Sequence, residues 1–292
     1  MLLFPHTEPG LAPQNHPMVH VRSPAAPGSH PPLTAHSSRA AGAPEPSTRV
    51  LAIIPARFAS SRFPGKPLVP IAGKPMIQHV VERTSLARSV SKVIVATDDS
   101  RIADAVHRFG GHALLTGSHR SGTDRIAEAA ETESRMHGPA EWILNVQGDE
   151  PLIDPGDLER LITGMRDIPG GLLGTLVHPL QSEAELHDVH VVKAVLDTQR
   201  RALYFSRSPI PFPREPGRLG WRHMGVYLYR VEFLQTFHRL PATELSEREQ
   251  LEQLRALEHG YPIHCFDAAS LSIGVDVPED VKKVEAALAH GH

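Results

Sequence analysis

Cationic and small polar side chains are concentrated in one short stretch of the sequence. Arg57, Arg62 and Lys66 fall within ten consecutive residues. The same stretch holds the small residues Ser60, Ser61 and Gly65. Fixed cations beside hydroxyl and backbone N–H donors are the groups that bind phosphate oxygens. The stretch therefore predicts an anion-binding loop; the alternative is a surface loop whose arginine side chains are solvated.

Two aspartates are candidates for holding a metal ion. Asp149 lies in Q-G-D-E-P, directly after an apolar stretch, and Asp276 lies in G-V-D-V-P-E-D ahead of a helical pattern. A hard cation is often held by one or two carboxylates together with phosphate oxygens. Asp149 is the first metal candidate and Asp276 the second. For each, a turn or helix-capping role is the alternative, because aspartate is also common at helix starts.

The element ahead of the cationic loop reads as a buried strand. Val50–Ile54 is an unbroken apolar run with β-branched residues, which is typical of a strand covered on both faces of a parallel sheet, and Pro55 is expected to end it. In open α/β sheets, ligands bind outside the carboxyl ends of the strands. The loop is neither a Walker motif nor a dinucleotide-binding motif, because a single glycine, Gly65, precedes Lys66.

From residue 50 onward, short apolar strands alternate with amphipathic helices. Strands are predicted at 50–54, 92–97, 112–115 and 141–146, with helices at 75–88, 100–109 and about 122–136. Three strand–helix units before the fourth strand predict an α/β fold with a doubly wound, mostly parallel Rossmann-like sheet. Further strands are predicted at 174–180, 191–197, 202–206, 225–230 and 261–266, and further helices at 157–165, 231–238, 246–259 and 279–290. We predict one domain over 49–292, with a smaller inserted lobe for substrate binding or dimer formation at about 174–240.

Residues 1–48 differ in composition from the rest of the chain. They hold ten of the 27 prolines and five of the 19 histidines, without apolar periodicity. Such a segment buries too little apolar surface to offset the entropy of ordering it, so we predict a disordered extension. We assign it no function. A translation start at Met18 or later is an alternative to the first methionine.

The composition of the whole chain limits which partners and which cellular compartment are expected. The formal net charge of −3 provides no basic field for nucleic acid or anionic lipid. No apolar stretch approaches the roughly 20 residues of a membrane helix, so no membrane partner is expected. The only cysteine, Cys265, excludes an intramolecular disulfide and favours a cytoplasmic location.

Eight motifs, in order, resemble those of the cytidylyltransferases that activate 3-deoxy-manno-octulosonate (Kdo) as CMP-Kdo. The resemblance spans about residues 50–288 and implies a Rossmann-like sheet of the nucleotide-diphospho-sugar transferase type. The motifs are PARFASSRFPGKPL (from Pro55), IVATDD (94–99), SGTDR (121–125), NVQGDEP (145–151), ALYFSRSPIP (202–211), RHMGVYLYR (222–230), EQLEQLRAL (249–257) and GVDVPED (274–280).

The resemblance implies a role for each candidate residue and a reaction. The anomeric hydroxyl of the sugar would attack the α-phosphorus of CTP in line and expel pyrophosphate, with charge stabilised by Mg²⁺ and by a clamp of arginine and lysine. The family's usual assembly is a homodimer. By resemblance, the CTP triphosphate would be held by Arg57, Ser60, Arg62 and Lys66, the rest of the nucleotide by Ser121, Thr123 and Arg125, with Gln147 reading the cytosine, Mg²⁺ by Asp149 and Asp276, and the acid sugar by Arg207, His223, Tyr227, Glu249 and Gln253.

The chain departs from the family pattern at four positions. Val189 and His190 replace a usual Pro-Asn pair, Ser246 replaces a glutamate that opens a helix, and Asp124 replaces the glutamate of S-G-T-E-R. The first three lie in the half expected to meet the sugar, so an amino-Kdo or another 3-deoxy-ulosonic acid is an alternative substrate. Sialic-acid cytidylyltransferases lack the R-x-P-G-K-P-L run, and the G-x-G-x-R-L opening of sugar-1-phosphate nucleotidylyltransferases is absent here. A non-catalytic nucleotide-binding homologue is the alternative from another functional class.

Overall fold

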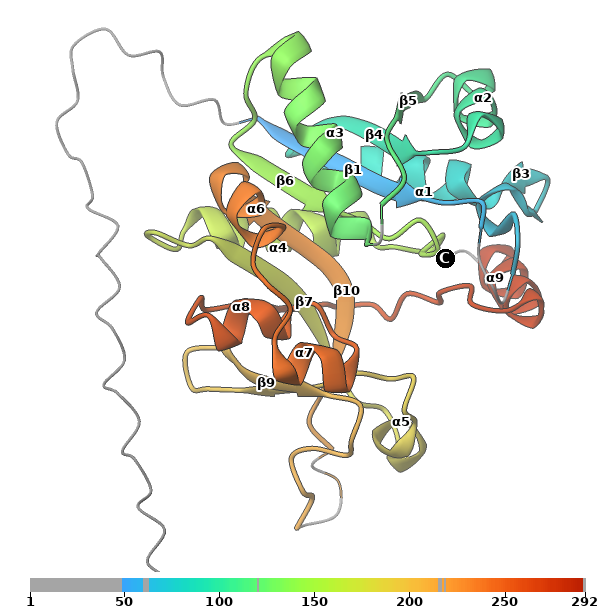
Figure 1. The fold of residues 1–292 in the computed structure, drawn as a ribbon. Coiled ribbons are helices and arrows are strands. Elements are labelled where there is room, and N and C mark those ends of the chain that lie inside the picture. The colour runs from blue at the N-terminus through green and yellow to red at the C-terminus, as the bar shows by residue number, and fades with distance from the viewer. Residues whose placement is uncertain (1–48, 60–62, 120, 215–216, 218, 291–292) are drawn as a thin grey trace, which may run out of the picture. The chain divides into compact units, whose positions relative to one another are not determined.

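The structure, a computed structural model, describes residues 49–59, 63–119, 121–214, 217 and 219–290 (Figure 1). The prediction for the extension 1–48, and those for Ser60 and Arg62, lie outside the described residues.

The described residues form a nine-stranded mixed sheet at the centre of the fold (Figure 1). Its main path runs β11-β7-β10-β6-β1-β4-β5, and β8 joins the sheet by pairing with β10 and β9. The strands β5, β4, β1 and β6 are parallel to one another, whereas β10 is antiparallel to both β6 and β7. The strands are β1 Val50–Ala56, β4 Val90–Thr97, β5 His112–Leu115, β6 Trp142–Asn145, β7 Leu173–Pro179, β8 Lys193–Leu196, β9 Ala202–Ser206, β10 Trp221–Arg230 and β11 His264–Asp267.

Helices cover both faces of the sheet, which confirms the predicted doubly wound, mostly parallel α/β fold. Helices α1, α2 and α4 pack on one face, and α3 and α6 pack on the other. A small hairpin, β2 (Pro70–Ile71) and β3 (Lys74–Pro75), was not predicted. The helices are α1 Met76–Ser85, α2 Ser100–Arg108, α3 Gly122–His137, α4 Pro155–Arg166, α5 Glu183–His187, α6 Val231–Phe237, α7 Glu244–Glu249, α8 Leu254–Glu258 and α9 Pro278–Ala289, with a 3₁₀ turn η1 at Lys66–Leu68.

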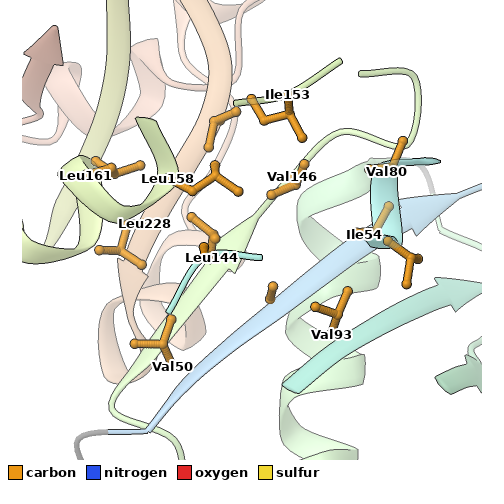
Figure 2. Close-up of a cluster of buried hydrophobic side chains, with 14 of the residues drawn as sticks. Val50, Ile54, Val80, Val93, Leu144, Val146, Ile153, Leu158, Leu161 and Leu228 are labelled. Atoms are coloured by element: carbon orange, nitrogen blue, oxygen red, sulfur yellow. The ribbon is translucent and has the colours of Figure 1, made fainter. Parts of the chain in front are cut away.

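Strand β1 is buried on both faces, as its apolar run predicted. Val50 and Ile54 belong to the cluster with α1 and α4, which Figure 2 shows, whereas Leu51 and Ile53 belong to the cluster with α3 and α6. The strand continues through Pro55 to Ala56, so the expectation that Pro55 ends it was wrong. Pairing with β6 stops at Ile53, and a proline is tolerated beyond that point because the ladder on that side has ended.

The predicted helix at 246–259 is instead two short helices, α7 and α8. Gln250 breaks it by adopting a left-handed conformation, with φ 55° and ψ 46°. The turn lets Leu251 and Leu254 enter the core, where they are 7% and 0% exposed. Burial of two leucines stabilises the fold by several kcal/mol, at roughly 1.5–3 kcal/mol each, which exceeds the strain of one residue in this region, about 1–3 kcal/mol.

The carboxyl-terminal segment is docked beside the first loop. Helix α9 buries Val284 against Ile71 of the hairpin and Met76 of α1. This contact brings the chain just before α9 to the carboxyl edge of β1 and β6. No helix among the described residues is long and apolar enough to cross a membrane.

Candidate active site

Two adjoining cavities lie at the carboxyl edge of the parallel strands. The smaller, of about 220 Å³, is lined by the loop after β1, by η1 and by the start of α3. The larger, of about 690 Å³, is lined by β10, by the segment between α7 and α8, and by the loop before β8. Among the described residues, Gly122, Gln147, Asp149 and Asp276 line both cavities. The shared wall thus contains both predicted metal ligands.

Lys66 lies between the two candidate metal aspartates. Its Nζ is 2.7 Å from Asp149 Oδ2 and 3.6 Å from Asp276 Oδ1, and it donates to Val275 O at 2.7 Å. The backbone N–H of Val275 donates to Asp149 O at 2.9 Å. These contacts join β1's loop, β6's loop and the segment before α9. The structure therefore brings together Lys66, Asp149 and Asp276, which the sequence alone could not do.

Gly274 permits this close approach of the two loops. A Cβ atom there would lie 3.3 Å from Glu150 Oε1 and 3.6 Å from Asp149 O. The first of these is tighter than an ordinary van der Waals contact, so the Glu150 carboxylate would have to move by a few tenths of an ångström to admit a side chain at this position.

The donor set fits a hard divalent cation. No group of three or more His, Cys, Asp or Glu side chains with metal-binding geometry occurs within the part of the chain that the structure describes. Mg²⁺ typically uses only one or two protein carboxylates and takes its other ligands from water and phosphate oxygens. The pair Asp149 and Asp276 matches that requirement, although their role as ligands stays a prediction.

The carboxyl of Glu150 lies beside Asp149 in the wall of the larger cavity. Burial, with a further contribution from the charge of Asp149, raises the pKa of Glu150 to about 7. Arg222, which also lines the larger cavity, acts in the opposite direction. The contribution from the charge of Asp149, unlike that from burial, is one that a cation bound beside the two groups would relieve.

The residues predicted to hold the nucleotide line the smaller cavity. Ser121 caps α3, its Oγ accepting from Asp124 N at 3.1 Å, so the amino end of a 16-residue helix faces the site. Arg125 is 3% exposed and donates to Asp98 Oδ2 at 2.8 Å and to Thr116 Oγ1 at 2.6 Å. Arg57, Gln147 and the tip of Lys66 complete this wall, and Thr123 lines the larger cavity instead.

Three of the five predicted sugar ligands line the larger cavity: His223, Tyr227 and Gln253. Arg207 and Glu249 are not among its lining residues. The guanidinium of Arg207 donates to Glu249 O and to Val189 O, each at 2.9 Å, and the carboxylate of Glu249 accepts from Arg207 N at 2.9 Å. These bonds tie the residue after β9 to the end of α7 and to the loop before β8, and a role for Arg207 or Glu249 in sugar binding stays a prediction.

Several cavity residues were missed by sequence reasoning. Glu252 lines the larger cavity and accepts from Thr123 Oγ1 at 2.6 Å. It lies in the same EQLEQLRAL motif as Glu249, next to Gln253, and the motif alone did not show which glutamate faces the site. Arg222, the first residue of RHMGVYLYR, and Glu150, which follows Asp149, were likewise within recognised motifs.

The departures from the family pattern differ in their position. His190 lines the larger cavity, whereas Val189 is 57% exposed and is not among the lining residues. Ser246 lies in the first turn of α7 and bonds back to the cap residue Thr243: its Oγ accepts from Thr243 N at 3.0 Å and donates to Thr243 O at 2.9 Å. Of these three departures, only His190 lines the cavity expected to hold the sugar.

Comparison with known proteins gives one consistent result. The cytidylyltransferase family model matches residues 51–266. A 3-deoxy-manno-octulosonate cytidylyltransferase of Syntrophotalea carbinolica is 50% identical over 251 residues, covering 82% of this chain and 98% of that protein. An 8-amino-3,8-dideoxy-manno-octulosonate cytidylyltransferase of Shewanella loihica is 49% identical over 243 residues, covering 82% of this chain and 98% of that protein.

A solved structure agrees with these relatives. A CMP-2-keto-3-deoxy-manno-octonic acid synthetase in complex with CTP superposes with a TM-score of 0.78 at 45% identity, covering 84% of this chain and all of that one. Because the family model matches most of the chain and the relatives share about half of its residues, this protein belongs to the cytidylyltransferase family.

Proposed function

We propose that this protein transfers CMP from CTP to the anomeric hydroxyl of Kdo, releasing CMP-Kdo and pyrophosphate for lipopolysaccharide biosynthesis. The observation that carries the proposal is the wall shared by the two cavities. Asp149 and Asp276 line both, so a nucleotide in the smaller cavity and a sugar in the larger would present their reacting atoms to the same two carboxylates. The similarity to Kdo cytidylyltransferases over most of the chain supports it.

The chain's own residues position and stabilise charge in this reaction. Asp149 and Asp276 would hold Mg²⁺, which when bound neutralises phosphate charge and lowers the pKa of a coordinated hydroxyl. Lys66, 2.7 Å from Asp149 Oδ2, is placed to stabilise the charge that develops on the triphosphate. The sugar oxygen forms a bond to the α-phosphorus while the bond to pyrophosphate breaks, so the protein needs no nucleophile of its own.

The sugar cavity supplies mixed hydrogen-bonding groups. Burial raises the pKa of the Tyr227 phenol well above its ordinary value, so its hydroxyl stays protonated and can donate. Gln253, 4% exposed, adds an amide with both a donor and an acceptor. Donors and acceptors side by side suit the hydroxyl groups of a sugar.

A second candidate keeps the chemistry and changes the sugar to 8-amino-Kdo. Relatives named for Kdo and for 8-amino-3,8-dideoxy-manno-octulosonate are 50% and 49% identical to this chain, so overall identity does not separate them. His190, in the wall of the sugar cavity, is the departure that could change the preference between a terminal hydroxyl and a terminal amine.

The proposed function includes a homodimer in the cytoplasm. The strand β9 pairs only with β8 among the described strands, and it carries Leu203, which is 60% exposed. An edge strand with an exposed leucine is a surface that a second copy would cover. The buried free thiol of Cys265 is consistent with a reducing compartment. Sedimentation of the purified protein tests the dimer.

Pyrophosphate release is the direct test of the function. The purified protein with Mg²⁺ is given Kdo with each of the four nucleoside triphosphates, and then CTP with Kdo or 8-amino-Kdo. We expect release with CTP and Kdo. Preferential release with 8-amino-Kdo would establish the second candidate, whereas stabilisation by CTP without release from any sugar would identify a nucleotide-binding homologue.

A further inference from the structure

A bulge in β10 lies between the two halves of the site. Pairing with β7 places Met224 opposite Leu176 and Tyr227 opposite Thr175, so Gly225 and Val226 are inserted between consecutive pairs. Bulges interrupt the hydrogen-bond ladder and re-aim neighbouring side chains. Gly225 O accepts from Gln147 Nε2 at 3.2 Å, which ties the bulge to the predicted cytosine-reading residue.

The hydroxyl of Thr175, on β7, contacts the other side of this bulge. Thr175 is 0% exposed, and its Oγ1 lies 2.7 Å from Val226 O, 3.3 Å from Met224 O and 2.9 Å from His223 Nε2. A hydroxyl has one proton to donate and can accept further bonds, whereas a carbonyl oxygen can only accept. The proton is therefore directed to Val226 O, the closest of the three partners.

The imidazole of His223 must then donate to Thr175. Because the Thr175 hydroxyl donates its proton to Val226 O, it can bond to the ring nitrogen of His223 only by accepting a hydrogen bond from it. If Thr175 donated to the ring instead, the carbonyl of Val226 would lose this donor inside the sheet, which is costly for a buried polar group. The geometry places the ring proton on Nε2 and leaves Nδ1 with a free lone pair.

The surroundings of His223 keep the ring neutral and oriented. Burial lowers the pKa of His223 to about 3, so the imidazole is uncharged at neutral pH. Its ring packs edge-on against Phe205, with centroids 4.9 Å apart, and 5.3 Å from the ring of Tyr227. Because His223 lines the larger cavity, an unprotonated Nδ1 is an acceptor available to a hydroxyl donor there.

We propose that Thr175 is a positioning residue that fixes His223 in the tautomer protonated at Nε2, so that Nδ1 accepts a hydrogen bond from a hydroxyl of the acid sugar. The assignment of the sugar rests on the proposed function. The assignment of the tautomer rests on the Thr175 contacts alone.

The tautomer is tested by NMR of protein labelled at the histidine ring nitrogens. The signals of His223 are assigned by their loss in the His223→Gln variant. In the wild-type protein we expect Nε2 to carry the proton and Nδ1 to show the shift of an unprotonated nitrogen. Thr175→Ser, which keeps the hydroxyl, should preserve this pattern, and Thr175→Val should replace it with a mixture of tautomers.

Kinetics test the consequence for the sugar. Thr175→Val should raise the KM for the acid sugar about tenfold, the usual effect of one lost hydrogen bond. Its KM for CTP should stay within about twofold of the wild-type value, and Thr175→Ser should restore sugar binding. A purely structural role for Thr175 would disturb both substrates, because the same bulge contacts Gln147.

The outcomes of these experiments separate a failure of this inference from a failure of the proposed function. A wild-type spectrum with the proton on Nδ1 overturns the inference even if Thr175→Val does not fold. An unchanged sugar KM in a folded Thr175→Val protein also overturns it. Absence of pyrophosphate release from the wild-type protein with every sugar would instead overturn the proposed function, and the wild-type spectrum would still decide the tautomer.

Discussion

At the scale of single residues, Lys66 is expected to have different partners with and without a bound metal ion. Without a metal ion, its ammonium offsets the charge of Asp149 at 2.7 Å and reaches Asp276 at 3.6 Å. A cation held by both carboxylates would take over that role, and the lysine would then be available to the triphosphate. In this structure the ammonium offsets the repulsion between the two carboxylates, and we expect it to do so until the substrates bind.

Replacing Asp149 with Asn should abolish most turnover and leave the fold intact. The change removes one carboxylate charge from the predicted metal site, and the expected loss in kcat is more than about 100-fold. Pyrophosphate release measures the loss, and circular dichroism checks the fold. Asp104→Asn, on an exposed face of α2 outside both cavities, is the matched control. Full activity of Asp149→Asn would remove Asp149 from the mechanism.

The buried imidazole of His223 should make the protein acid-sensitive. Its pKa falls from the ordinary 6.5 to about 3 in the folded state, so between these values the unfolded chain binds a proton that the folded chain does not. The stability is therefore complete above about pH 6.5 and is lost as the pH falls toward about 3. At about pH 4.5, about two pH units below the ordinary pKa, the loss should be roughly 3 kcal/mol.

His223→Gln isolates this contribution. The variant cannot gain the proton, so its stability relative to the wild-type protein should improve between about pH 7.5 and about pH 4.5. Denaturant unfolding at both pH values measures the difference. A constant difference between the two proteins would show that His223 titrates alike when folded and unfolded.

At the scale of elements, the helix break at Gln250 explains why Glu252 lines the larger cavity and Glu249 does not. The apolar pattern of 246–259 predicts one continuous helix, and a left-handed turn at a non-glycine residue has no strong sequence signal. After the break, Glu252 and Gln253 line the cavity while Glu249 bonds to Arg207 and Ser206. Tertiary burial of the leucines on either side of Glu252 decided the turn, and such burial cannot be read from local sequence.

Ser246 should act on stability and not on turnover. Its hydroxyl bonds both backbone groups of Thr243 at the start of α7, so Ser246→Ala should cost about 1 kcal/mol of unfolding free energy, as lost caps do. Pyrophosphate release should be unchanged. Ser246→Glu restores the residue usual in the family and should be near neutral, since glutamate at this position can also bond the cap residue's N–H. A large loss of turnover in Ser246→Ala would place Ser246 in the sugar site.

At the scale of the whole molecule, the sequence predicts the first half of the chain better than the second. The strands and helices of the first half were predicted because each apolar run and cap is local, and parallel order follows from the alternation of the two. The antiparallel insertion of β10 between β6 and β7, and the addition of β8 and β9, depend on contacts between distant segments. Individual candidates such as Lys66 and Asp149 could be named from their motifs, but their approach to Asp276 required the fold.

The two joined cavities predict that nucleotide binding stabilises the protein in a metal-dependent way. With CTP at about 100 times its Kd, the gain should be about 2.7 kcal/mol, seen as a rise in Tm with Mg²⁺. Asp276→Asn should reduce the rise, and a chelator should do the same in the wild-type protein. An equal rise with and without Mg²⁺ would indicate that CTP binds through the cationic loop alone.

The bond from Lys66 to Val275 O joins residues 209 positions apart. The last strand of the described sheet ends at Asp267, before that bond can form. Val275 and Asp276 therefore follow every strand of the described sheet in the sequence. Proteolytic removal of the residues after Asp267 would take away a candidate metal ligand without cutting any described strand, and we expect such a fragment to lose turnover.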